Sequence, residues 1–345
     1  MGNQSLDDRI ANLNYQIHTR NTCDQKEYQE VEQKLQEEQA RAKDTRASNQ
    51  SEASPFQDPM ILEPFPVNRG SVSEHVLFLA RCAFALLIDF IAGSYFVFIG
   101  FVYCSDDWNE EPIDPEKPTW IFLHGKGSRR GSFLPISTSP FFKKQANIRM
   151  MNLEPKLLFS NFHTDSLEVY VDRVEKKIEQ VMQEINKACT KRGWNPKMRN
   201  QKVHILAHSM GGAVSLGYIA KHPENVGRFV CMASPLRGAP VAYMQRLWIQ
   251  LAEELLPGSP YLQNLRKKSL LSIRSQRISM TVLCGEMDLL TPSRYVAFPG
   301  AQRKVHRWIG HVGILFSAFF WGLPEIFART KDQHKTYYQR TIKPV

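Results

Sequence analysis

Residues 202–212 read KVHILAHSMGG, a short apolar run that ends in a serine with small neighbours. Ser209 has Ala207 two positions before it and Gly211 two positions after it. This spacing is typical of a sharp turn from a strand into a helix, where small neighbours leave room for an exposed serine hydroxyl. The positive N-terminal end of the helix that follows stabilises negative charge developing near the serine. The stretch therefore predicts a buried strand followed by a nucleophile.

Other apolar runs of similar length alternate with helical stretches along the chain. With KVHILA (202–207) they are TWIFL (119–123), ANIRMMNL (146–153), GRFVCMA (227–233), ISMTVLC (278–284) and KVHRWIG (304–310). Residues 165–193 keep apolar side chains at helical spacing, and Gly193 closes that stretch. The alternation predicts an α/β fold, a mainly parallel sheet with helices on both faces. Functional loops in such sheets follow the carboxyl ends of the strands.

Two of these loops carry an acid and a histidine suited to assist Ser209. His311 follows the run at 304–310, and we expect it to accept the serine proton and pass it to the leaving group. Asp288 follows the run at 278–284 and is the expected acid that orients the imidazole. Glu286 is the second candidate for that acid, although it lies nearer the strand. His306 lies inside an apolar run and is expected to be structural.

A glycine-rich loop after the first run predicts the oxyanion hole. The backbone N–H groups of Lys126 and Met210 are the expected donors to the developing oxyanion. Gly125 and Gly127 allow the loop to come close to a substrate carbonyl. His124 is expected to orient this loop by a hydrogen bond and to take no catalytic role.

With serine, acid and histidine in this chain order, the sequence from Pro118 to Pro324 resembles the α/β-hydrolase superfamily. Within it, residues 233–240 (ASPLRGAP) resemble a segment of bacterial lipases and GPI-inositol-deacylase-like proteins. Leu236 stands where those proteins usually have His, and Ser234 where they have Thr.

The resemblance implies a lipase- or esterase-like serine hydrolase that cleaves carboxylic esters, of the acyl-lipid type, through an acyl-serine intermediate. It implies no cofactor and no metal. Thioesterase, acyltransferase or peptidase chemistry on the same residues stays open, as does an inactive hydrolase fold that serves as an interaction protein. Residues 240–274 are the expected cap, in which residues 242–256 form either a mobile lid helix or a permanently packed one.

The apolar stretch Val76–Cys104 is longer than the ~20 residues that cross a bilayer as a helix. Arg81 and Asp89 interrupt it, and such charges are costly inside a span. We expect a membrane-associated helix, single-pass or monotopic, on an otherwise cytoplasmic protein. The alternative is a helix that packs on the enzyme.

The chain before the predicted hydrolase domain (119–345) divides by composition into three more segments. Residues 1–50 are polar and helical, residues 51–75 form a proline-containing linker, and residues 105–118 form an acidic one. Apolar positions within residues 6–35 allow helical self-association, with a solvated helix as the alternative. The cysteines are scattered, which favours reduced thiols over disulfides or a zinc site.

Charge is distributed unevenly between the two parts of the chain. Residues 1–118 carry 20 acidic and 10 basic side chains, whereas residues 119–345 carry 14 acidic and 34 basic ones. The basic part would be attracted to an anionic membrane surface, although a merely soluble basic surface is an equal interpretation. No nucleic-acid partner is expected, because no zinc-finger spacing, helix-turn-helix or aromatic RNA-binding motif accompanies the charge.

Overall fold

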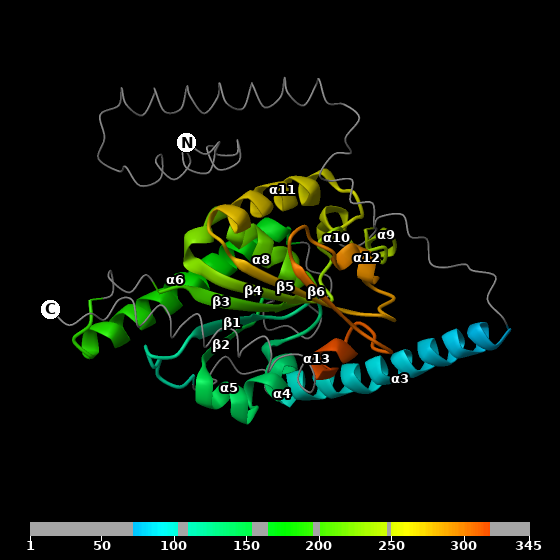
Figure 1. Ribbon diagram of the computed structural model, residues 1–345, viewed down its shortest axis with the longest axis horizontal. Helices are drawn as coiled ribbons and strands as arrows, with labels where there is room; N and C mark the ends of the chain where they lie inside the picture. Colours follow the sequence, from blue (N-terminus) through cyan, green and yellow to red (C-terminus); the bar gives the residue numbers. More distant parts are fainter. Residues whose placement is uncertain (1–71, 103–109, 154–164, 196–200, 247–249, 318–345) are drawn as a thin grey trace, which may run out of the picture. The chain divides into compact units, whose positions relative to one another are not determined.

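The computed structural model describes residues 72–102, 110–153, 165–195, 201–246 and 250–317 (Figure 1). All of them belong to one compact unit, Asn68–Val345, which is separate from the unit Met1–Val67. The predicted helix over residues 1–50, its self-association through residues 6–35 and the linker up to residue 71 lie outside the described residues.

The core of the unit is a six-stranded sheet in the order β2-β1-β3-β4-β5-β6, and every neighbouring pair is parallel. This confirms the predicted fold class, an α/β fold with a mainly parallel sheet. The strands are β1 (Thr119–Leu123), β2 (Asn147–Met151), β3 (Val203–His208), β4 (Val226–Met232), β5 (Ser279–Gly285) and β6 (Gln302–His306). Both β1 and β3 are buried along their whole length, as expected for central strands covered on two faces.

Helices cover both faces of this sheet, and alternate residues of β1 identify the faces (Figure 1). Ile121 and Leu123 join a core with α6 (Leu167–Lys191), α8 (Met210–Lys221) and α11 (Pro260–Ser275). Trp120 and Phe122 join the opposite core. That core includes residues of α3 (Val72–Val102), η2 (Arg130–Phe133), α4 (Leu134–Ser137), α5 (Pro140–Gln145) and α13 (Gly313–Ser317).

The range predicted as a cap, residues 240–274, contains α9 (Ala242–Gln245), α10 (Gln250–Glu254) and most of α11. Helix α11 connects β4 to β5 and packs against α8. The carboxylate of Glu254 in α10 accepts a hydrogen bond of 2.6 Å from the N–H of Leu167, the first residue of α6. Thus α10 is fixed to the N-terminus of α6, while Tyr243 and Met244 of α9 are exposed. Two further short helices, η4 (Pro223–Asn225) and α12 (Ser293–Val296), lie outside this range.

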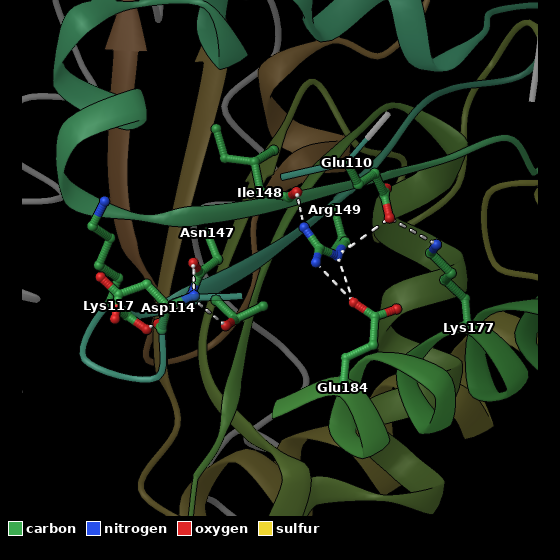
Figure 2. A network of polar contacts seen from close by, with 9 residues as sticks. Glu110, Asp114, Lys117, Asn147, Ile148, Arg149, Lys177 and Glu184 are labelled. Carbon is green, nitrogen blue, oxygen red and sulfur yellow. Dashed lines mark hydrogen bonds and ion pairs between the residues drawn. The ribbon is translucent and has the colours of Figure 1, made fainter. Parts of the chain in front are cut away.

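Residues 110–118, predicted as part of an acidic linker, are tied to the edge strand β2 (Figure 2). The side chain of Asn147 accepts the N–H of Asp114 and donates to the carbonyls of Asp114 and Lys117. The guanidinium of Arg149, with a side chain only 4% exposed, pairs with Glu184 at 2.8 Å and Glu110 at 3.2 Å. The described part of the segment is therefore bound to the sheet by specific contacts.

Most of the apolar stretch predicted over Val76–Cys104 lies in α3 (Val72–Val102). One side of this helix lies against the core that contains Trp120 and Phe122. Ala85 and Ala92 are buried, and Tyr95 stacks edge-on with Phe316. The guanidinium of Arg81 lies 5.4 Å from the ring of Trp308. The carboxylate of Asp89 accepts the N–H of His311, so both charged residues that interrupt the stretch, Arg81 and Asp89, face the enzyme.

The described side chains of α3 that face away from this core are mostly apolar and exposed. Its exposed large side chains are Val76, Leu77, Phe78, Leu79, Phe84, Leu86, Leu87, Phe90, Ile91 and Phe98. Within the described chain, Val76–Tyr95 is one helix that is long and apolar enough to cross a bilayer, and only 11% of its most apolar window is buried. A core helix of a soluble protein would be mostly buried.

Candidate active site

The three predicted catalytic residues form a continuous hydrogen-bonded chain at the carboxyl edge of the sheet. The Nε2 atom of His311 lies 2.9 Å from Oγ of Ser209. Its Nδ1 atom lies 2.9 Å and 3.1 Å from the two carboxylate oxygens of Asp288. Because Asp288 can only accept when ionised, these partners assign Nδ1 as the donor and leave Nε2 to accept the serine proton.

Ser209 occupies a strained turn between β3 and α8. Its backbone has φ 52° and ψ −128°, a positive φ that non-glycine residues rarely adopt. The N–H of Ser209 donates to the carbonyl of Met232 at the end of β4, which holds the turn against the neighbouring strand. The hydroxyl is thereby directed toward His311 at the N-terminal end of α8, where backbone N–H groups lack helical partners.

Gly125 comes so close to Ser209 that no side chain fits between them. In the register of β1 and β3, Leu123 lies opposite Ala207, which places Gly125 level with the nucleophile. A Cβ atom on Gly125 would lie 2.7 Å from Cβ of Ser209 and 3.3 Å from its Oγ. The glycine-rich loop thus lines the nucleophile directly.

His124 orients this loop, in the position that the sequence predicts. It is fully buried, and its Nδ1–H donates to the carbonyl of Gly125 at 2.8 Å. Its Nε2 accepts the N–H of Leu153, at 2.9 Å, from the segment after β2. Neither nitrogen faces Ser209. The predicted donors of the oxyanion hole, the N–H groups of Lys126 and Met210, follow Gly125 and Ser209 in the chain and remain a prediction.

The acid in contact with His311 is Asp288 rather than Glu286. The Asp288 carboxylate is fully buried, and one of its oxygens accepts the N–H groups of Leu290 and Thr291 at 3.0 and 2.7 Å. These bonds fix the direction of the carboxylate. Glu286 is exposed and accepts the N–H of Trp308 at 3.1 Å. His306 is the last residue of β6. Its pKa is lowered mainly by burial and to a smaller extent by the nearby charge of Lys304.

Two residues that touch the backbone of His311 were not predicted as part of the site. His208 Nε2 lies 3.0 Å from the carbonyl oxygen of His311 and donates to it. Burial, and next the nearby His311, lower the pKa of His208 to about 3, although its bond to the His311 carbonyl acts in the opposite direction. On the other side, the carboxylate of Asp89 accepts the N–H of His311 at 2.8 Å.

The signal for Asp89 was present in the sequence as a carboxylate within an apolar helix. A carboxylate in such a helix indicates either a buried acceptor with a specific partner or an interrupted membrane span, and the sequence favours neither. For His208 the only signal in the sequence was its position next to Ser209.

Among the described residues no group of three or more His, Cys, Asp or Glu side chains is arranged to hold a metal ion. The described cysteines, Cys82, Cys189, Cys231 and Cys284, are unbridged.

Comparison with known proteins gives one family and a set of similar folds. The model of the serine aminopeptidase family S33 matches residues 163–283, about a third of the chain. A lipase of Bacillus licheniformis, BlEst2 in mature form, is 14% identical with a TM-score of 0.47, over 64% of this chain and 94% of that one. A monoacylglycerol lipase of Paleococcus ferrophilus is 13% identical with a TM-score of 0.42, over 64% of this chain and 96% of that one.

The thioesterase domain of the curacin biosynthetic pathway is 12% identical with a TM-score of 0.38, over 60% of this chain and 91% of that one. No curated protein sequence matches the chain. The family match over residues 163–283, the parallel sheet and the strand-to-helix turn at Ser209 are the features that this chain has in common with α/β-hydrolases.

Proposed function

We propose that the protein is a serine hydrolase that cleaves carboxylic esters, with acyl-lipids as the substrate class. The observation that carries the proposal is the chain of contacts from Ser209 Oγ through the two nitrogens of His311 to Asp288. A serine in a strained turn, a histidine with one nitrogen free to accept, and a buried acid are the parts that acyl transfer requires.

The proposed reaction has two halves. In the first, His311 Nε2 takes the proton of Ser209 as Oγ forms a bond to the ester carbonyl carbon. The N–H groups of Met210 and Lys126 would stabilise the negative oxygen. His311 then protonates the departing alkoxide, and the carbon–oxygen bond of the ester breaks to leave an acyl-serine.

In the second half, water gives a proton to His311 and attacks the acyl-serine. Collapse of the second tetrahedral intermediate breaks the bond to Oγ, returns the proton to Ser209 and releases the carboxylic acid. Throughout, Asp288 accepts the Nδ1–H bond, which fixes the imidazole orientation and stabilises the imidazolium.

The membrane part of the proposal rests on the two sides of α3. The helix contacts the enzyme at several positions between Arg81 and Tyr95, which lie on one side three, four or seven residues apart. It therefore lies along the enzyme over this length. A helix held in this way would enter a bilayer by its outward apolar side, parallel to the surface, so we propose monotopic attachment rather than a span. The basic charge of residues 119–345 would assist binding to anionic lipid.

Activity is tested with a fluorophosphonate probe and a series of p-nitrophenyl esters, thioesters and phospholipids. Ser209→Ala should abolish labelling and turnover, whereas Ser275→Ala, a matched change at an exposed serine of α11, should affect neither. Absence of labelling in the wild type would indicate an inactive interaction protein. Labelling with faster thioester cleavage, or with transfer to an added alcohol, would replace the ester-hydrolase proposal by the corresponding thioesterase or acyltransferase.

Attachment is tested by flotation of the full chain with vesicles of phosphatidylcholine and phosphatidylserine. Phe90 and Ile91 are 73% and 55% exposed on the outward side of α3, and Phe90→Glu with Ile91→Glu should abolish flotation. Leu271→Glu is the matched control, because Leu271 is an equally exposed apolar residue (62%) on α11. Flotation that survives the double change in α3 would contradict attachment through this helix.

A further inference from the structure

The carboxylate of Asp89 holds three consecutive backbone N–H groups of the segment that carries His311. One oxygen accepts the N–H of His311 at 2.8 Å, and the other accepts those of Val312 at 3.0 Å and Gly313 at 2.7 Å. Gly313 begins α13, so the unpaired N–H groups at the start of that short helix are capped by a residue 224 positions earlier in the chain. A carboxylate that accepts several backbone N–H bonds is a strong, charge-assisted acceptor.

The segment is also shaped to let α3 approach. A Cβ atom on Gly310 would lie 2.2 Å from one carboxylate oxygen of Asp89. A Cβ atom on Gly313 would lie 2.9 Å from Cγ2 of Ile88 and 3.2 Å from the other oxygen of Asp89. Side chains at these two positions would push the helix away from the backbone of His311.

His311 is therefore fixed at four polar groups. Its side chain is held by Ser209 and Asp288, its carbonyl by His208, and its N–H by Asp89. The first three partners come from the sheet or the loops that follow it, whereas Asp89 comes from a helix that precedes the sheet altogether.

We propose that Asp89 is a positioning residue for catalysis, and that docking of α3 sets the active geometry of His311. The proposal rests on the serine-hydrolase function proposed above. When Asp89 is removed, the three N–H groups lose their acceptor and the loop relaxes toward other partners. A displacement of about 1 Å at a catalytic group lowers the rate by about 100-fold, since the reacting atoms lose their alignment.

The test compares Asp89→Ala and Asp89→Asn with Gly93→Ala, a change on the same helix whose added methyl group would meet no atom within 4 Å. Asp89→Ala should lower kcat by about 100-fold with KM unchanged, because the loss concerns alignment of the base and not substrate binding. Asp89→Asn keeps the shape but replaces one acceptor oxygen by a donor, so its kcat should fall by an intermediate factor. Gly93→Ala should keep the wild-type kcat. Thermal unfolding of each variant establishes that the compared proteins are folded.

A double-mutant cycle separates positioning from general destabilisation. If Asp89 acts through His311, Asp89→Ala should cause no further loss of the residual labelling rate in a His311→Ala background. Losses that multiply in the double variant, or a kcat within threefold of wild type for folded Asp89→Ala, would overturn the proposal.

A second measurement covers the case in which Asp89→Ala does not fold. In the wild type, the amides of His311, Val312 and Gly313 should be protected from hydrogen exchange, and Asp89→Asn should lose that protection there first. Unprotected amides in the wild type would also overturn the proposal. The outcome for Ser209→Ala is independent, so labelling that is lost in Ser209→Ala but kept in Asp89→Ala would refute only the role of Asp89.

Discussion

The imidazole of His208 donates to the backbone carbonyl of His311 across 3.0 Å, so the residue before Ser209 holds the main chain of the histidine proposed as its base. Its ring centroid lies 5.1 Å from that of His311. A histidinium at this site would be buried beside a second imidazole that must gain a proton during turnover. The low pKa of His208 keeps it neutral and removes that competition.

This pKa predicts a specific dependence of stability on pH. Since the folded pKa of about 3 lies below the ordinary value of 6.5, the unfolded state binds more protons between these pH values. The contribution is fully present above pH 6.5 and is lost as the pH falls toward 3, at about 1.4 kcal/mol per pH unit.

His208→Gln keeps a hydrogen-bond donor but cannot titrate. Between pH 7 and pH 5, the free energy of unfolding from urea titrations should fall by about 2 kcal/mol more in the wild type than in His208→Gln. Equal decreases in the two proteins would show that His208 is not a buried neutral group.

Gly125 is predicted to tolerate no side chain. In Gly125→Ala the added methyl group would overlap Cβ of Ser209, so the turn or the loop must shift and kcat should fall by about 100-fold or more. Gly93→Ala is the control, because its methyl group would meet no atom within 4 Å. Ester turnover and the rate of fluorophosphonate labelling measure the effect, and a Gly125→Ala protein with wild-type rates would contradict the described approach.

The assignment of the acid predicts unequal effects at two nearby carboxylates. Asp288→Asn removes the charge that selects the His311 tautomer and should lower kcat by about 10⁴-fold. Glu286→Gln, which has no contact with the imidazole, should lower it far less. The pair is compared in the same kcat measurement, and a larger loss for Glu286→Gln would reverse the assignment.

Arg149 is predicted to contribute to stability and not to turnover. Arg149→Ala leaves Glu110 and Glu184 without their buried partner and should lower the free energy of unfolding by about 3 kcal/mol. Lys177→Ala removes only a more exposed pair with Glu110, at 3.4 Å, and should cost less than about 1 kcal/mol. Denaturant titration measures both, and equal costs would show that burial of Arg149 has no energetic effect.

The parallel sheet and the contacts among Ser209, Asp288 and His311 could be anticipated because they depend on local signals. Buried strands are short apolar runs, and functional residues follow their carboxyl ends. The predicted limits of the last strand differ from those in the structure. The apolar run at 304–310 predicts a strand there, but β6 spans Gln302–His306 and Trp308 has a φ of 63°, which strand backbone does not adopt.

The role of α3 could not be anticipated from local pattern. Its apolar residues predict a helix and a membrane surface, but nothing in the neighbouring sequence shows which side meets the enzyme. The partners of Asp89 are backbone N–H groups more than 220 positions away, and backbone groups have no signature in the sequence. The sequence therefore shows a carboxylate within an apolar helix but not the backbone groups that Asp89 binds.

Under the proposed function, exchanging α3 for another helix would not separate membrane attachment from catalysis. A chimera that replaced residues 72–102 by an unrelated anchor helix would keep the sheet and all three residues of the Ser209–His311–Asp288 chain, and it could still bind vesicles. It would nevertheless lack the acceptor for the His311 backbone. In the proposed enzyme, residues 72–102 therefore have two roles, as the membrane-binding helix and as part of the support of His311, and an exchanged helix would keep only the first.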